Sequence, residues 1–136
     1  MTLRFTRWIP AFGLPAVGLA AALVLSPATA QAADVANGKT LFEANCASCH
    51  GTSGKGDGPT GVALAAQGTS PRDFTVADFK FDTDKDGKAG TDTDLANVIK
   101  NGAGAYGGSP LMAPWGHLGD AAIADLVAYV RTFHQQ

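Results

Sequence analysis

"NCASCHG", residues 45–51, contains both cysteines of this 136-residue chain, and a histidine follows the second cysteine directly. A disulfide between Cys46 and Cys49 would close a loop too small to hold a domain together. A structural zinc site takes four ligands, usually from two spaced pairs, and the sequence has no second cysteine pair. A thioredoxin-type redox pair belongs to a βαβ context, which is absent here. None of these three uses explains the motif well.

Cys-x-x-Cys-His is instead the attachment signature of c-type haem. Two thiols on one helical turn can reach the two vinyl groups on one edge of a porphyrin, and the next side chain can place its imidazole under the iron. We therefore predict one covalently bound haem c, with Cys46 and Cys49 as its thioether attachments and His50 as an axial ligand of the iron.

The rest of the chain has the periodicity of short helices. Apolar or small residues recur at spacings of three and four in three stretches: residues 34–49, 91–102 and 120–133. A fourth, shorter stretch, residues 59–68, starts with a proline, which is typical of a helix start. Thr91 or Thr93 is a suitable N-cap for the stretch over residues 91–102, and Gly102 is a suitable stop. No stretch alternates convincingly as a strand, apart from a turn or two around residues 78–81. The pattern predicts an all-α fold.

The predicted helices provide little apolar surface for a core. They are short, and the glycine-rich loops between them are long, notably residues 51–58 and 101–110. A domain of about 100 residues is already marginal in the surface it buries, and loops of this length are uncommon in compact domains unless they wrap something. A flat apolar macrocycle would supply the missing core. We expect three to four short helices wrapped around one covalently bound haem.

The N-terminal segment has the features of a secretory signal. Arg4 and Arg7 precede an apolar run over residues 9–25, which is followed by two overlapping small-x-small sites for signal peptidase, Ala28-Thr29-Ala30 and Ala30-Gln31-Ala32. An uncleaved membrane anchor is the alternative, because no charged residue interrupts the run. Prolines and glycines within it favour the cleaved signal.

These features divide the chain into two parts. We predict a signal peptide over residues 1–32, cleaved after about Ala30 to Ala32, and one periplasmic domain over residues 33–136 that does not insert stably into a membrane. Of the ten basic residues, loss of the two near the N-terminus leaves eight against twelve acidic ones, a net charge of about −4. This charge argues against nucleic acid as a partner, since nucleic-acid binding needs a basic surface.

The chain resembles the class I c-type cytochromes of bacteria over nearly all of its predicted mature length. In that family a glycine and an aromatic residue precede the haem motif at four-residue steps, as Gly38 and Phe42 do here. The segment "CHGTSGKGDGPTG", residues 49–61, is similar to the family's loop after the histidine, and Leu126 and Tyr129 stand where its C-terminal helix crosses the first helix. The resemblance implies the cytochrome c fold.

The resemblance also implies a second axial ligand. In the family a methionine in a loop over the distal face binds the iron through its sulfur, and Met112, in "SPLMAPWG", residues 109–116, is the only methionine of the predicted mature chain. Core filling is the alternative role for Met112. His117 is a rival ligand in the same loop, whereas His134 is expected to be a solvated residue at the end of the last helix. A thioether ligand stabilises ferrous iron, which predicts a relatively high reduction potential.

Three further residues have weaker assignments. The resemblance implies that the carbonyl of Pro59 accepts the Nδ1 proton of His50 and fixes the imidazole ring. Arg72 is either a partner for a haem propionate or a solvated arginine. Trp115 is either a propionate donor packed on the macrocycle or an ordinary core aromatic.

An acidic run forms the front half of an EF-hand loop. Asp82, Asp84 and Asp86 stand at alternate positions and Gly87 follows them. The back half fails, because position twelve is Thr93 where a bidentate glutamate is expected. A solvated loop is therefore the favoured expectation, and calcium binding is the alternative.

With both axial positions filled, the iron has no open site for a substrate, so we expect electron transfer and no enzymatic activity. The predicted function is a soluble periplasmic carrier that cycles one haem iron between Fe(II) and Fe(III). Its expected partners are redox proteins of the dehydrogenase, oxidase or reaction-centre type. Two alternatives stay open: a cytochrome subunit that accepts electrons from a bound periplasmic dehydrogenase, and a haem enzyme or gas sensor, which needs an open or labile sixth position.

Overall fold

The computed structural model describes residues 32–135, and within this part the chain is all-α, as predicted. The α-helices are α1 (Val35–Asn45), α2 (Ala47–His50), α3 (Pro59–Ala65), α4 (Asp92–Asn101) and α5 (Asp120–Thr132). Two short 3₁₀ helices, η1 (Ala103–Tyr106) and η2 (Gly116–Leu118), lie between α4 and α5, and a third, η3 (Phe133–Gln135), follows α5. In the described residues no strand forms around 78–81. The predicted signal peptide lies outside the described residues, apart from Ala32.

The first predicted helix is divided in two. Asp34 caps α1, because its side chain accepts hydrogen bonds from backbone N–H groups of the first turn. At Cys46 the backbone leaves the helical path, with φ −116° and ψ −33°, and α2 begins at the next residue. The single helix predicted over residues 34–49 was therefore wrong in this respect. The break leaves both cysteines and His50 on or beside one short helical turn.

Helices α1 and α5 cross at Gly38. A Cβ atom at this position would overlap the carbonyl of Asp125, so the two backbones come this close only because the residue is glycine. One turn further along α1, the buried ring of Phe42 packs edge-on against Tyr129, with ring centroids 5.4 Å apart. Leu126 is buried in the same cluster. The predicted crossing of the two helices is confirmed.

A methyl group at this crossing is expected to destabilise the protein. Replacing Gly38 with alanine should lower the free energy of unfolding by about 1–3 kcal/mol, because the backbones of α1 and α5 must separate. Denaturant unfolding of the haem-bound protein measures the change. Lys39→Ala is the matched control, since Lys39 is the exposed neighbour on α1, and its effect should stay within about 0.5 kcal/mol. Equal effects of the two substitutions would contradict the close contact.

Thr91, and not Thr93, caps α4. Its side chain accepts a hydrogen bond from the backbone N–H of Asp94, and the carboxylate of Asp94 accepts one from the backbone N–H of Thr91. The helix ends at Gly102, whose φ of 78° favours glycine, as predicted. This cap fixes the start of α4 against the loop that precedes it.

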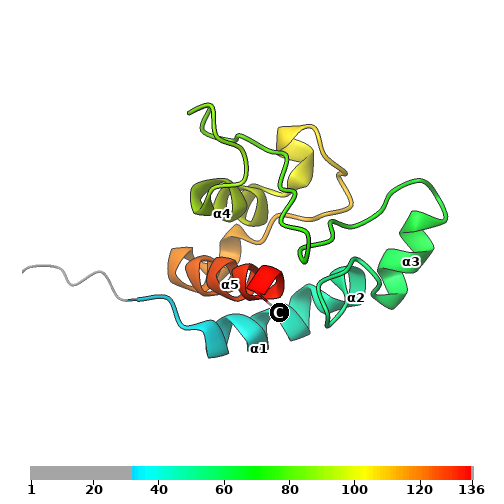
Figure 1. The fold of residues 1–136 in the computed structure, drawn as a ribbon, viewed down its shortest axis with the longest axis horizontal. Helices are drawn as coiled ribbons and strands as arrows, with labels where there is room; N and C mark the ends of the chain where they lie inside the picture. Colours follow the sequence, from blue (N-terminus) through cyan, green and yellow to red (C-terminus); the bar gives the residue numbers. More distant parts are fainter. Residues whose placement is uncertain (1–31, 136) are drawn as a thin grey trace, which may run out of the picture. The chain divides into compact units, whose positions relative to one another are not determined.

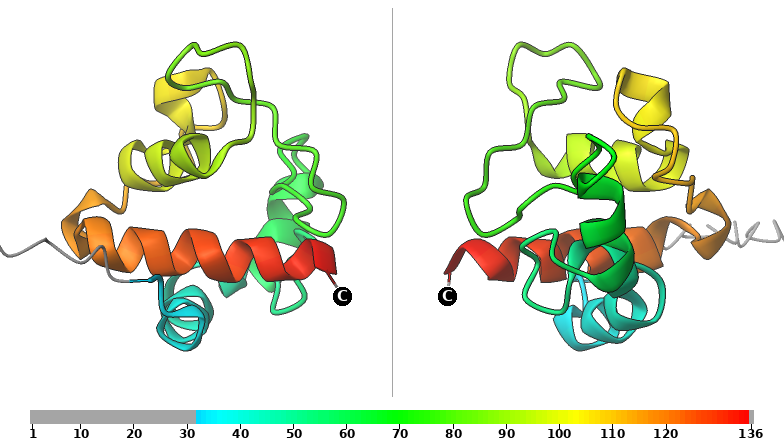
Figure 2. Two further views of the ribbon diagram at one scale, coloured as in Figure 1. Left: turned by 60° about the vertical axis from the view of Figure 1, so that its left-hand side comes forward. Right: turned by 90° about the vertical axis from the view of Figure 1, so that its right-hand side faces the viewer.

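Helix α5 lies between α1 and α4 (Figure 1), and both views in Figure 2 show the same order. Within the described residues α1 and α4 each pack on α5 but not on one another. Arg131 of α5 donates hydrogen bonds to the carboxylate of Asp92 and the carbonyl of Gly90, at 2.8 and 2.6 Å. These bonds hold the start of α4 on α5. Side chains of α2 and of α4, two helices far apart in the sequence, line the same cavity.

Candidate cofactor site

A cavity of about 440 Å³ lies among α2, α4, α5 and the loops around them. Its size is typical of sites that bind small molecules and cofactors. Most of its wall is apolar, with phenylalanine, leucine, valine and isoleucine side chains. The polar or sulfur-containing residues that reach it include every residue predicted to bind the cofactor: Cys46, Cys49, His50 and Met112.

Both cysteine thiols are free and half-buried in the cavity wall. Burial, together with a smaller effect of charge repulsion from the neighbouring Cys49, raises the pKa of Cys46 to about 11. Cys46 is therefore a protonated thiol at neutral pH. A thiol of this kind can add its S–H across a vinyl group to give a thioether. A disulfide between Cys46 and Cys49, which the sequence already disfavoured, is not present.

His50 presents an oriented, neutral imidazole to the cavity. Its ring stacks on Phe74, with centroids 4.6 Å apart and an interplanar angle of 18°. Burial lowers the pKa of His50, although a hydrogen bond to the Arg72 carbonyl opposes that effect. Nδ1 lies 3.3 Å from this carbonyl oxygen. When Nδ1 carries the proton and donates it there, the lone pair of Nε2 is free to bind a metal.

The partner of Nδ1 differs from the prediction. The carbonyl of Pro59 was expected to accept the His50 proton, but the carbonyl of Arg72 stands there instead. Pro59 is the first residue of α3 and does not line the cavity. Proline at a helix start is explained by its fixed φ and missing N–H alone.

Met112 reaches the cavity from the loop that follows η1. Its side chain is half-buried and lines the cavity. The backbone N–H of Trp115 donates to the carbonyl of Ile99 at 2.9 Å and holds this loop on the C-terminal end of α4. The loop backbone also passes so close to Gly102 that a Cβ there would lie 2.7 Å from the carbonyl of Met112. The loop is therefore held by a rigid element.

The two rival histidines lie elsewhere. His117 is exposed and does not line the cavity, although its ring lies 5.5 Å from that of Trp115, which does. His134 is also exposed, with Nδ1 3.1 Å from the carbonyl of Thr75. Of the ligand candidates weighed from the sequence, only Met112 shares the cavity with His50.

Arg72 and Trp115 both line the cavity, as their predicted propionate roles require. The guanidinium of Arg72 lies 3.5 Å from the exposed carboxylate of Asp78 and is itself partly exposed, so the structure offers it a partner on the surface. Trp115 is half-buried. A bond from either residue to a propionate stays a prediction.

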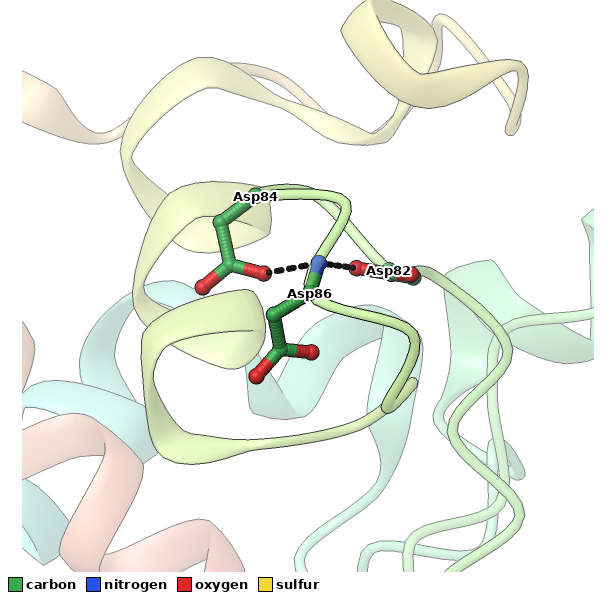
Figure 3. Close-up of side chains that lie close together, drawn as sticks. All are labelled: Asp82, Asp84 and Asp86. Carbon is green, nitrogen blue, oxygen red and sulfur yellow. Dashed lines mark hydrogen bonds between the residues drawn. The ribbon is translucent and has the colours of Figure 1, made fainter.

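The three aspartates of the acidic loop gather as the EF-hand pattern suggests (Figure 3), with one oxygen of each within 4.8 Å of the others. Asp82 accepts hydrogen bonds from the backbone N–H groups of Asp86 and Gly87, at 3.1 and 3.0 Å, and Asp84 accepts one from Asp86 at 3.2 Å. A tight turn with φ of 88° at Gly87 is thus enough to bring the carboxylates together. Hydrogen bonds within the loop therefore explain why the three carboxylates lie close together.

Two residues of the site were missed by sequence reasoning. Phe74 stacks on His50, and the only local signal was an aromatic residue two positions after Arg72. Asp94 lines the cavity with its side chain 1% exposed. Its signal was the Thr-x-x-Asp spacing of a capping box, which predicts a helix start but not burial.

Two free thiols, an imidazole with one free nitrogen and a thioether in one largely apolar cavity fit a covalently attached haem. They define a c-type haem protein.

The chain belongs to the cytochrome c family, whose sequence model, described as Cytochrome c, matches residues 35–134. It is similar to the cbb3-type cytochrome c oxidase subunit CcoP of Azospirillum sp. (strain B510), with 30% identity over 109 residues, 79% of this chain and 31% of that protein. It is also similar in structure to a chain of the Kuenenia stuttgartiensis reducing HAO-like protein complex Kustc0457/Kustc0458. The TM-score is 0.55 and the identity 32%, over 71% of this chain and 41% of that one. The chain spans less than half the length of either relative.

Family membership establishes three of the predicted properties. The domain has the cytochrome c fold, its single cysteine pair provides for one covalent haem c, and it is an electron carrier. In the part of the chain that the structure describes, no helix is both long and apolar enough to cross a membrane.

Proposed function

We propose that the protein is an exported one-electron carrier whose haem c is attached through Cys46 and Cys49, with His50 and Met112 as the two axial ligands of the iron. The observation that carries this proposal is that His50, from α2, and Met112, from the loop after η1, line the same cavity. The rival histidines lie outside that cavity, which supports methionine as the second ligand.

The residues of the chain have distinct tasks in this function. When bound, the haem supplies the Fe(II)/Fe(III) couple. The Arg72 carbonyl and the Phe74 ring hold the imidazole of His50 in one orientation, which limits rearrangement when the charge of the iron changes. Met112 offers a soft sulfur that favours the ferrous state. If His50 and Met112 both bind the iron, the protein would pass electrons through the bound haem and would leave no position at the iron for a substrate.

The proposal is tested by the optical spectrum of the purified protein. Methionine–iron ligation gives a weak far-red band in the ferric form, and a filled sixth position prevents carbon monoxide from binding to the ferrous form without denaturant. We expect both results. A protein that lacked the band and bound carbon monoxide at once would instead be a haem enzyme or gas sensor.

A second candidate function is a cytochrome subunit of a larger redox enzyme. Both relatives are named as parts of oxidase or HAO-like assemblies, which favours this reading. A free carrier should be a monomer in solution and should exchange electrons with several redox proteins. A subunit should instead co-purify from its own source with one oxidoreductase and accept electrons only from it.

A further inference from the structure

Asp94 is a buried carboxylate that the electron-transfer function above does not use. Its side chain is 1% exposed, as buried as Phe42 and Leu126 in the core. It belongs to the first turn of α4 and lines the cavity, whereas its neighbours Asp92 and Thr93 are exposed. Among the described residues it forms no ion pair with a lysine, arginine or histidine.

Four hydrogen-bond donors surround this carboxylate. Oδ1 accepts from the backbone N–H and the hydroxyl of Thr83, and Oδ2 accepts from the same two groups of Thr91, at distances between 2.5 and 2.9 Å. The amide of Asn97 in turn donates to the Thr83 hydroxyl at 2.9 Å. The two backbone N–H groups can only donate, so a proton on either oxygen of Asp94 would face donors. The geometry therefore fits the ionised carboxylate.

The balance of physical effects agrees with an ionised group. Burial by itself would raise the pKa of Asp94, but the hydrogen bonds from Thr83 and Thr91 outweigh it and hold the pKa well below its usual range. A negative charge in a low-dielectric wall is screened little and acts over a longer range than a charge in water. Ferric haem carries one more positive charge than ferrous haem, so such a charge favours the ferric form.

We propose that Asp94 is a positioning residue with two effects: it joins Thr83 and Thr91 of the preceding loop to α4, and it holds a fixed negative charge in the cavity wall that lowers the reduction potential of the haem. The inference rests on the haem lying in this cavity, as proposed above. Asp94 and Met112 then act in opposite directions on the potential, and neither needs to touch the other.

The test compares two aspartates two residues apart. Asp94→Asn removes the buried charge, and Asp92→Asn removes the same formal charge, with its ion pair to Arg131, from an exposed side chain in the same turn of α4. Redox titration of the haem-bound protein should show that Asp94→Asn shifts the equilibrium constant in favour of the ferrous form by up to about tenfold, which is 59 mV for a one-electron couple. The shift should persist at high salt. The shift from Asp92→Asn should be smaller and should vanish with salt.

Further variants separate the charge from the structural link. Thr91→Val weakens the link but keeps the charge, so it should speed amide hydrogen exchange in residues 83–91 and leave the potential unchanged. Asp94→Glu should also keep the wild-type potential. Asp94→Ser is made alongside the asparagine variant, because a hydroxyl can both donate and accept opposite the threonines; one folded neutral variant is enough for the comparison.

Two outcomes would overturn the inference. One is a wild-type potential in the neutral Asp94 variants, and the other is an equal upward shift in Thr91→Val, which would assign the effect to loop movement. The potentials of these variants are measured independently of the far-red band that tests Met112 as a ligand. Failure of the Asp94 inference can therefore be distinguished from failure of the proposed function.

Discussion

Replacing Cys46 and Cys49 together with alanine is expected to give a chain that retains no covalently bound haem and does not unfold cooperatively. The reason is the cavity, which would have to stay open or collapse. The cavity of about 440 Å³ is lined mostly by apolar side chains, and without haem these side chains would face water or collapse together, which costs stability on the order of several kcal/mol. The whole stability of a domain is about 5–15 kcal/mol. We therefore expect the apolar residues of the chain to be insufficient to stabilise the fold without the haem.

Two measurements check this result on the purified protein. Haem that stays with the polypeptide after acidic organic extraction reports the covalent bond, and circular dichroism during thermal unfolding reports the cooperative fold. Ser48→Ala is the matched control, because Ser48 is exposed between the two cysteines and should leave both readouts unchanged. A double variant that is colourless, compact and cooperatively folded would show that the haem is not the core of this domain.

The single-cysteine variants should be intermediate. One thioether keeps the haem attached, and the free His50 nitrogen can still bind the iron. The Cys46 variant tells more about the attachment geometry, because Cys46 is half-buried at the end of α1, where the helix is interrupted before α2. This break is the local structure that brings both thiols and His50 to one face of the cavity.

Most of the fold could be predicted from periodicity and end signals. The start of α4 at Thr91 and its end at Gly102 could be predicted, because helix capping and a glycine stop depend on residues close together in the sequence. The break at Cys46 could not be predicted, because residues 34–49 have continuous helical spacing and the turn depends on how α2 packs against α3. Long-range packing also explains why the Arg72 carbonyl, and not that of Pro59, faces His50.

The residues of the site also fall into those that a local motif predicts and those that only long-range packing places. The cysteines and His50 form a local motif whose chemistry fixes its spacing, and Met112 stood out as the only methionine outside the predicted signal. Asp94 looked like any helix-start aspartate, since nothing in its neighbourhood distinguishes a buried capping box from an exposed one. Its burial results from Thr83, eleven residues earlier, folding back onto it.

Replacing Met112 with alanine is expected to change the redox properties of the haem while leaving it attached. If Met112 is the ligand proposed above, loss of its thioether removes the group that favours ferrous iron, so the reduction potential should fall by on the order of 100 mV, within the roughly 0.8 V range that haem axial ligands span. The far-red band of the ferric protein should disappear, and the ferrous protein should bind carbon monoxide. Redox titration and optical spectroscopy measure all three changes.

His117→Ala is the control for the same loop. His117 lies five positions beyond Met112 but is exposed and outside the cavity, so its removal should leave the potential and the band unchanged. Met112→His should fill the sixth position again, which lowers the potential without admitting carbon monoxide. If the band survived in Met112→Ala and vanished in His117→Ala, the histidine would be the ligand, and the loop anchored on Ile99 and Gly102 would have to turn its other side to the iron.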